Sequence, residues 1–204
     1  AIPFDEQHPQ GPSTVKGKAR KRTADLLLQA IAEGKVQALI GRSADFFGEA
    51  AVNSMLYASF LERMLQGKSA QLIAPLEVPH TYAFVGDVGR ALVMLALEED
   101  CYGEVWHLPV GEPISLAEIH QQFNQLLATD LSASVMPTFL RVLLSLFIPP
   151  LKEVGEMLYQ FEAAYVMAWE KFGQRFPEFR VTPYEEAMGK MVDYFQTTSA
   201  QVSS

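Results

Sequence analysis

The chain has 204 residues, enough to bury a core, and its 49% apolar and 20% charged residues exclude an intrinsically disordered protein. The formal charge of −8 argues against a nucleic-acid partner, and the lone cysteine, Cys101, excludes an internal disulfide framework and suits a reducing cytoplasm. The most apolar run, Phe139 to Ile148, has about half the length that a bilayer requires, so we expect no membrane partner. The sequence indicates no metal site.

The first half of the chain alternates predicted helices with short apolar strands. A helix is predicted from Val15 to Glu33, because apolar residues recur at the spacing of one helical face and Gly34 follows. Val36 to Ile40 is apolar without polar alternation, which is typical of a strand buried in a parallel sheet. Further expected elements are a loop over Gly41–Glu49, a helix over Ala50–Leu65, a strand over Ala70–Ile73, an extended stretch over Thr81–Val85, and a helix over Val88–Glu98 with Asp87 as its N-cap.

The second half of the chain is richer in helices. Ser115-Leu-Ala-Glu118 is a capping box that predicts a helix to about Ala128, and Thr182-Pro-Tyr-Glu185 predicts the start of the last helix. One side of that last helix is apolar, with Tyr184, Ala187, Met188, Met191, Val192 and Phe195. The other expected elements are strands over Val105–Leu108 and Ser132–Met136 and helices over Thr138–Phe147, Leu151–Phe161 and Tyr165–Phe172. Alternating strands and helices predict an α/β fold with a helical appendage.

No Gly-x-Gly-x-x-Gly follows a predicted strand, so the dinucleotide-binding fingerprint is absent from the chain. Three other stretches are more informative in their order and spacing. They are Val36-Gln-Ala-Leu-Ile-Gly-Arg42-Ser-Ala-Asp45-Phe-Phe47-Gly48, then Tyr82-Ala-Phe-Val85-Gly-Asp87-Val-Gly-Arg-Ala91-Leu, and then Gly103-Glu-Val-Trp-His-Leu-Pro-Val-Gly111 followed by Ile114-Ser115.

Together these stretches resemble the C-terminal part of an extended short-chain dehydrogenase/reductase of the NAD-dependent epimerase/dehydratase family, in an atypical, epimerase-like branch. The resemblance implies an α/β fold formed by the C-terminal portion of a Rossmann-like parallel sheet and a mostly helical substrate domain. Residues 1–48 would be a remnant of the dinucleotide-binding domain, with a helix, a strand and the cleft loop. Residues 49–204 would form a substrate-domain-like α/β region with a helical C-terminus. We expect the N-terminal dinucleotide-binding half to lie outside this sequence.

The resemblance also implies cofactor-binding residues. Arg42, Ser43, Asp45 and Phe47 would belong to the loop that passes under the nicotinamide. Lys16 and Arg20 occupy the places of the catalytic Tyr-x-x-x-Lys pair. No tyrosine lies between Ala1 and Tyr57, so the catalytic residues stay unassigned.

Structural interpretations of the same residues remain open. Lys16 and Arg20 are equally consistent with solvated charges at the start of a helix. Arg42 and Asp45 are equally consistent with a pair that fixes the loop, and Phe47 with a core residue.

The resemblance implies a substrate-binding role for His80 and Tyr82. His80 stands seven residues before Asp87, where sugar-nucleotide epimerases commonly carry an arginine that holds the substrate pyrophosphate. Imidazole is largely neutral at pH 7 and lacks the bidentate fork of a guanidinium. The substitution favours a smaller or more apolar ligand than a nucleotide sugar. The alternative is that both residues only pack against the core.

Two functional hypotheses follow from the resemblance. The first is part of an NAD(P)-dependent epimerase- or reductase-like oxidoreductase that acts on a small molecule. The second is a non-catalytic dinucleotide-binding or protein-interaction module. We expect NAD or NADP in the complete protein and none on this chain alone. The expected partners are a small-molecule substrate and either the missing N-terminal half or a second copy of the chain.

Overall fold

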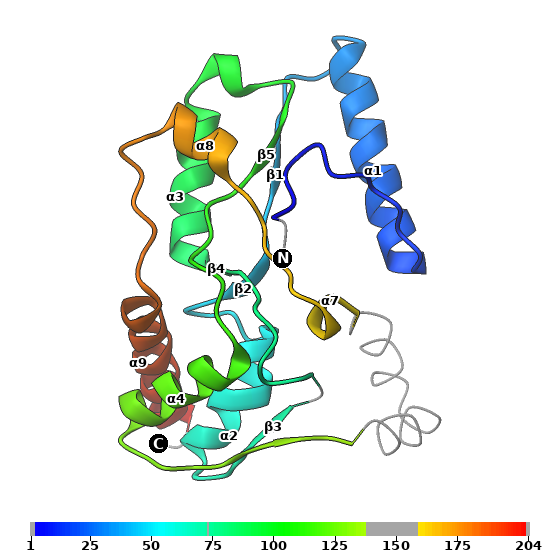
Figure 1. The fold of residues 1–204 in the computed structure, drawn as a ribbon. Helices are drawn as coiled ribbons and strands as arrows, with labels where there is room; N and C mark the ends of the chain where they lie inside the picture. The colour runs from blue at the N-terminus through cyan, green and yellow to red at the C-terminus, as the bar shows by residue number, and fades with distance from the viewer. Residues whose placement is uncertain (1–2, 73, 138–158, 203–204) are drawn as a thin grey trace.

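The computed structural model describes residues 3–72, 74–137 and 159–202, and its strands all pair in parallel (Figure 1). β1 (Ile40–Arg42) pairs with β5 (Val105–His107), β2 (Asp45–Phe47) with β4 (Tyr82–Phe84), and β3 (Ala70–Leu72) with β6 (Ala133–Val135). Parallel strands that lie side by side must be joined by long crossover connections. In this chain helices form large parts of those connections. The predicted α/β fold with a parallel, Rossmann-like arrangement is therefore confirmed.

The helices differ in how closely they pack on these strands. They are α1 (Val15–Ala32), a π-turn at Tyr57–Leu61 leading into α2 (Glu62–Leu65), α3 (Val85–Ala96), α4 (Leu116–Leu127), α7 (Tyr159–Glu162), α8 (Glu170–Arg175) and α9 (Tyr184–Val202), with a 3-10 turn at Glu99–Cys101. α4 and α9 lie beside the β2–β4 pair, whereas α1 stands at the edge of the molecule (Figure 1). None of the residues of α1 is buried. Among the described residues, no helix is both long and apolar enough to cross a membrane.

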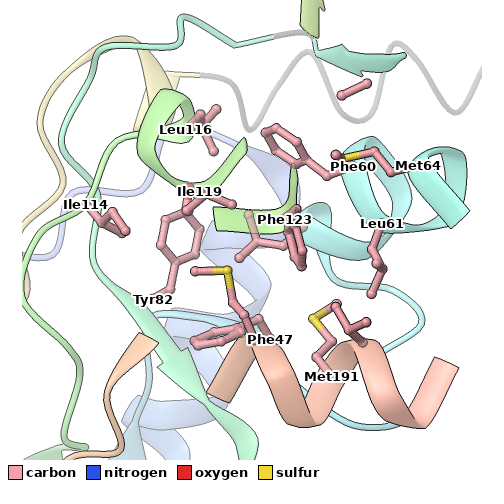
Figure 2. Close-up of a cluster of buried hydrophobic side chains, with 14 of the residues drawn as sticks. Phe47, Phe60, Leu61, Met64, Tyr82, Ile114, Leu116, Ile119, Phe123 and Met191 are labelled. Atoms are coloured by element: carbon pink, nitrogen blue, oxygen red, sulfur yellow. The ribbon is translucent and has the colours of Figure 1, made fainter. Parts of the chain in front are cut away.

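The largest core cluster lies between β2, β4, α2, α4 and α9 (Figure 2). Phe47 and Tyr82 from the strands meet Phe123 from α4 and Met191 from α9 in its interior. The apolar side predicted for α9 is confirmed, because every described α9 residue that is buried belongs to the predicted set. The members from α9 are Ala187, Met188, Met191, Val192 and Phe195, with Tyr184 packed against them.

The first predicted strand is displaced along the chain. We expected it over Val36–Ile40, but the strand runs from Ile40 to Arg42, and the Val36 side chain is 39% exposed. The parallel partner β5 begins only after the turn at Gly103, which has a φ of +85°. Pairing therefore begins with Ile40 opposite Val105. The expected loop over Gly41–Glu49 correspondingly contains the end of β1 and all of β2.

Asp87 does not cap a helix as predicted. α3 begins at Val85, two residues earlier, and the residue at its N-cap makes no side-chain cap hydrogen bond. The Asp87 carboxylate is buried and accepts hydrogen bonds from the backbone N–H and the hydroxyl of Thr182 at 2.8 and 2.7 Å. Thr182 is thus bound to α3, and α9 begins at Tyr184. The capping box at Ser115 and Glu118, by contrast, is present as predicted.

Two predicted helices differ from the structure for backbone reasons. The helix expected from Ala50 is helical only from residue 55. Ala50 has a φ of +58°, outside the right-handed helical region, and the Ser54 hydroxyl accepts a hydrogen bond from the Leu56 backbone N–H where the helix begins. The stretch expected as a helix from Tyr165 is largely extended, because its backbone bonds to Pro79 and Thr81, and α8 covers only Glu170–Arg175. The helix over Thr138–Phe147, and Leu151–Phe161 up to residue 158, lie outside the described residues.

Candidate functional site

A cavity of about 510 Å³ lies between the N-terminal segment, α1 and the carboxyl end of β1. Three basic side chains from two elements reach it: Arg20 and Lys21 from α1 and Arg42 from β1. The rest of the lining consists of Phe4, His8, Pro9, Gln10, Gly11, Pro12, Gly17, Ala24 and Tyr165. Arg20 and Arg42, which are 22 residues apart in the sequence, are therefore brought to one site.

The N-terminal segment is held in place by the extended stretch that follows α7. Phe4 donates its backbone N–H to Val166 at 3.0 Å and accepts from Ala168 at 2.9 Å. The Phe4 ring contacts Tyr165 edge-on, with ring centroids 4.8 Å apart. Glu6 also accepts a hydrogen bond from the backbone N–H of His107 at 2.7 Å, at the end of β5. These contacts position residues 8–12 as one wall of the cavity.

Arg42 and Asp45, for which we considered a direct pair, contact different partners. The Arg42 guanidinium donates to the side-chain oxygen of Gln10, with Nη1 at 2.6 Å, in the amide orientation that the donor geometry requires. Asp45 Oδ2 lies 2.9 Å from His80 Nε2. Arg42 thus joins β1 to the N-terminal segment, and Asp45 joins β2 to the His80 loop.

His80 is a buried histidine held between aromatic rings. Its imidazole stacks on Phe161 and on Tyr165 at centroid distances of 4.8 and 4.6 Å, each with an interplanar angle of 16°. Its Nδ1 is buried and has no hydrogen-bond partner within the described residues. The residue is 1% exposed and is separated from the cavity by Tyr165, which lines it. The structure thus places His80 behind the cavity wall.

Tyr82 and Phe47 lie in the core. The Tyr82 hydroxyl is buried without a hydrogen-bond partner in the described part of the chain, and burial raises the pKa of this phenol far above its usual value. Phe47 stacks on Tyr184, with centroids 5.7 Å apart, and packs against Phe84. Neither residue lines the cavity at α1.

The remaining predicted residues have different surroundings. Arg20 lines the cavity, whereas Lys16 is exposed on α1 and lies outside the lining. The Ser43 hydroxyl is buried and has no hydrogen-bond partner among the described residues. Of the predicted cofactor residues, the structure therefore brings only Arg20 and Arg42 to this cavity.

Sequence reasoning missed Tyr165, His8 and Gln10 as lining residues. Tyr165 was expected inside a helix, and its place depends on backbone bonds to residues 79 and 81. His8 and Gln10 belong to a proline-rich segment without periodicity. No local signal in the sequence identifies any of the three. Among the described residues, no group of three or more His, Cys, Asp or Glu side chains could hold a metal ion.

Comparison with solved structures shows the same fold in several NAD complexes. The dTDP-glucose 4,6-dehydratase of Bacillus anthracis matches with a TM-score of 0.74 and 14% identity over 98% of this chain and 58% of that one. The UDP-glucuronic acid 4-epimerase of Bacillus cereus matches with a TM-score of 0.77 and 12% identity, over 97% and 57%. The UDP-glucose 4-epimerase of Thermus thermophilus matches with a TM-score of 0.74 and 15% identity, over 96% and 58%. The chain therefore spans less than two thirds of the length of these proteins.

A search of curated protein sequences found no match. The model of the NAD dependent epimerase/dehydratase family matches residues 2–108, more than half of the chain. That region contains α1, the N-terminal segment and the β1–β5 pair, and with them both arginines of the cavity. The chain belongs to the NAD dependent epimerase/dehydratase family.

Proposed function

We propose that the complete protein is an NAD(P)-dependent epimerase- or reductase-like oxidoreductase that acts on a small molecule. One observation carries the proposal: the cavity with Arg20 and Arg42 opens at the carboxyl end of β1, a strand in a parallel pair. In open α/β sheets, ligands bind in crevices outside the carboxyl ends of the strands. Family membership and NAD complexes of the same fold support the choice of cofactor.

The described residues that line the cavity are suited to binding a cofactor or substrate. They do not include the Tyr-x-x-x-Lys pair that carries the usual chemistry of the family. Guanidinium groups bind phosphate and carboxylate through bidentate hydrogen bonds, and Arg20 and Arg42 supply two of them. The buried, unpartnered Ser43 hydroxyl follows directly after Arg42. NAD or NADP would supply the hydride-transfer chemistry. The chain would contribute orientation and charge at the nicotinamide end, with residues 1–48 as part of the cofactor domain.

The proton donor separates the two functional hypotheses. α1 contains no tyrosine, and Lys16 and Arg20 stand where the resemblance places the Tyr-x-x-x-Lys pair. This observation favours the second candidate, a non-catalytic dinucleotide-binding or interaction module. Tyr165 is the one phenol among the described lining residues, and it supports the enzyme. For the enzyme, Tyr165→Phe in the complete protein should abolish turnover while cofactor affinity is retained. For the module, neither variant nor wild type should transfer hydride to any carbonyl substrate.

The cofactor contact is tested by Arg42→Ala in the complete protein. A charged hydrogen bond contributes about 1.5–3 kcal/mol, so its loss should weaken NADH or NADPH binding about tenfold or more. Lys18→Ala is the matched control, because Lys18 is exposed on α1 and lies outside the cavity lining. Binding is measured by quenching of the reduced-nicotinamide fluorescence, and melting is measured in parallel. Unchanged affinity with a lower melting temperature would show that Arg42 only fixes the loop through Gln10.

We also propose that a partner covers α1 and the segment that follows it, either the rest of the protein or a second copy of the chain. Val15, Leu26 and Val36 are large apolar side chains exposed by 78%, 61% and 39%. Burying exposed valine or leucine stabilises a protein by roughly 1.5–3 kcal/mol per side chain. Sedimentation equilibrium of the purified chain tests the proposal, with mass spectrometry to detect a second polypeptide. A cooperatively folding monomer of 22.7 kDa would contradict it.

We propose a cytoplasmic location, and the composition of the chain, with its single cysteine, is what supports it. Cys101 is buried as a free thiol, and burial is the main cause that raises its pKa. A raised thiol pKa lowers the fraction of reactive thiolate. Fractionation of cells that express the tagged protein would test the location.

A further inference from the structure

Tyr165 forms part of the cavity wall at α1, and its ring is held by two other rings. Phe4 contacts it edge-on, with centroids 4.8 Å apart, and the His80 imidazole stacks on it at 4.6 Å with an interplanar angle of 16°. A phenol hydroxyl forms a hydrogen bond only within a narrow range of distance and direction. The use of this hydroxyl at the cavity therefore depends on the rings that hold Tyr165.

The backbone brings Tyr165 and His80 together independently of their side chains. The Tyr165 N–H donates to the Pro79 carbonyl at 3.0 Å, and the Tyr165 carbonyl accepts from the Thr81 N–H at 2.9 Å. These bonds lie on either side of His80 in the sequence and form a parallel bridge between His80 and Tyr165. A change of the His80 side chain should therefore leave the two segments adjacent and alter only the contact between the rings.

The position of the His80 imidazole is fixed by more than stacking. Its backbone is bonded to Ile114 in both directions, at 3.1 and 3.0 Å, and its ring also stacks on Phe161 of α7 at 4.8 Å. Contacts between ring faces limit the tilt of the imidazole. A hydrogen bond constrains direction as well as distance, so the bond from Nε2 to Asp45 Oδ2, at 2.9 Å, sets where the edge of the ring points.

The exposure of the two partners shows which residue depends on the other. The Asp45 side chain is 35% exposed, so water can solvate its carboxylate. The His80 side chain is 2% exposed, and Asp45 is its one hydrogen-bond partner among the described residues. An ionised carboxylate can only accept hydrogen bonds, so the imidazole carries a hydrogen on Nε2 and donates it. Asp45 thus orients His80 from the end of β2 that pairs with Tyr82.

We propose that Asp45 and His80 are positioning residues for Tyr165, with Asp45 fixing the imidazole of His80 and the imidazole fixing the phenol at the cavity. The three residues come from β2, from the segment before β4 and from the segment after α7. The positioning itself requires only the described residues. It rests on the proposed function only for the phenol acting on a bound substrate.

Fluorine NMR of the complete protein, with 3-fluorotyrosine in place of tyrosine, tests the proposal. Tyr165→Phe identifies the signal of Tyr165 by its loss. Asp45→Ala should move that signal toward the position of free 3-fluorotyrosine, because the imidazole is no longer fixed. Asp45→Asn should restore the wild-type signal, since its amide oxygen still accepts from Nε2. Asp193→Ala is the matched control, because it removes an exposed carboxylate of α9 and should leave the signal unchanged.

A second variant shows whether Asp45 acts through His80. His80→Phe keeps a ring beside Tyr165 but has no hydrogen-bond donor, so Asp45→Ala should cause no further movement of the Tyr165 signal in that background. A pair that only stabilises the fold would lower the melting temperature and leave the Tyr165 signal in place. If His80→Phe fails to fold, the comparison of Asp45→Ala with Asp45→Asn still decides, because the Asp45 side chain is partly exposed.

The inference is wrong if Asp45→Ala leaves the Tyr165 signal unchanged, or if it moves the signal equally in the wild-type and His80→Phe backgrounds. Turnover by Tyr165→Phe separates this result from the proposed function. If Tyr165→Phe retains turnover while Asp45→Ala moves the signal, the positioning holds and the proposed role of the phenol fails. If Tyr165→Phe abolishes turnover and Asp45→Ala leaves the signal unchanged, only the positioning is refuted.

Discussion

Replacing Asp87 by alanine should be among the most destabilising single changes in this chain. The carboxylate is 1% exposed and accepts hydrogen bonds from the backbone N–H and the hydroxyl of Thr182. It also accepts from Arg90 Nη2 at 2.6 Å. Through these bonds one buried side chain joins α3 to the segment that leads into α9. Alanine would leave the Thr182 groups without their buried acceptor.

The magnitude follows from the burial of the partners. Removing one member of a buried ion pair costs about 3–5 kcal/mol. Arg90 is 54% exposed at its side chain and can be solvated again after the change, which places the expected loss near the lower end, at about 3 kcal/mol. Against a typical total stability of about 5–15 kcal/mol, this is a large fraction. Thr182→Val removes the hydroxyl donor and keeps the backbone N–H, so it should cost less, about 1–2 kcal/mol.

Urea unfolding followed by circular dichroism measures both changes. Glu186→Gln is the matched control, because it removes a carboxylate from an exposed ion pair with Lys190 four residues along α9. Exposed pairs of this type contribute about 0.3–0.5 kcal/mol. If Asp87→Ala changed the free energy of unfolding no more than Glu186→Gln does, the argument that Asp87 fastens α3 to α9 would be refuted.

Three further predictions concern local features. Burial raises the pKa of Tyr184 to about 12, above about 10 for an unfolded tyrosine. The neutral phenol therefore stabilises the folded state fully below pH 10, and this contribution is lost as the pH rises toward 12. Ultraviolet pH titrations of wild type and Tyr184→Phe should differ by this late ionisation, and a difference without it would contradict the prediction. Gly48→Ala should destabilise the protein by about 1–3 kcal/mol, because Gly48 has a φ of +133° and a Cβ there would lie 2.6 Å from a valine side chain. Gly89 lies on α3 with open space around it, so Gly89→Ala should stabilise the protein by about 0.5–1 kcal/mol. Thermal unfolding measures both changes. Ser115→Ala should cost about 1 kcal/mol in the same assay, since the serine oxygen caps α4, and an unchanged melting temperature would show that the capping box contributes nothing.

Features that depend on neighbours in the sequence were predictable. The start of α1 at Val15, the capping box at Ser115 and the apolar side of α9 all follow from residues within a few turns of one another. The family was also predictable, because three stretches in the right order and spacing carry it, and the family model and solved structures agree. Parallel pairing followed from the apolar strands between helices.

Features that depend on distant partners were not predictable. β1 begins at Ile40 because β5 pairs with it only from Val105, and Asp87 is a buried acceptor because Thr182 lies 95 residues away in the sequence and adjacent in space. Both outcomes depend on segments that are distant in the sequence, and the local periodicity of a segment carries no information about such partners.

The candidate site shows the same division. The sequence by itself singled out Arg20 near a helix start and Arg42 in a loop that follows a strand, and left their roles open. Only the tertiary structure joined them at one cavity, and only it placed Tyr82 in the core and His80 against Asp45 behind the wall. The physical reason is that charge and helical periodicity are encoded locally, whereas a binding site is formed by side chains that meet only when the chain folds.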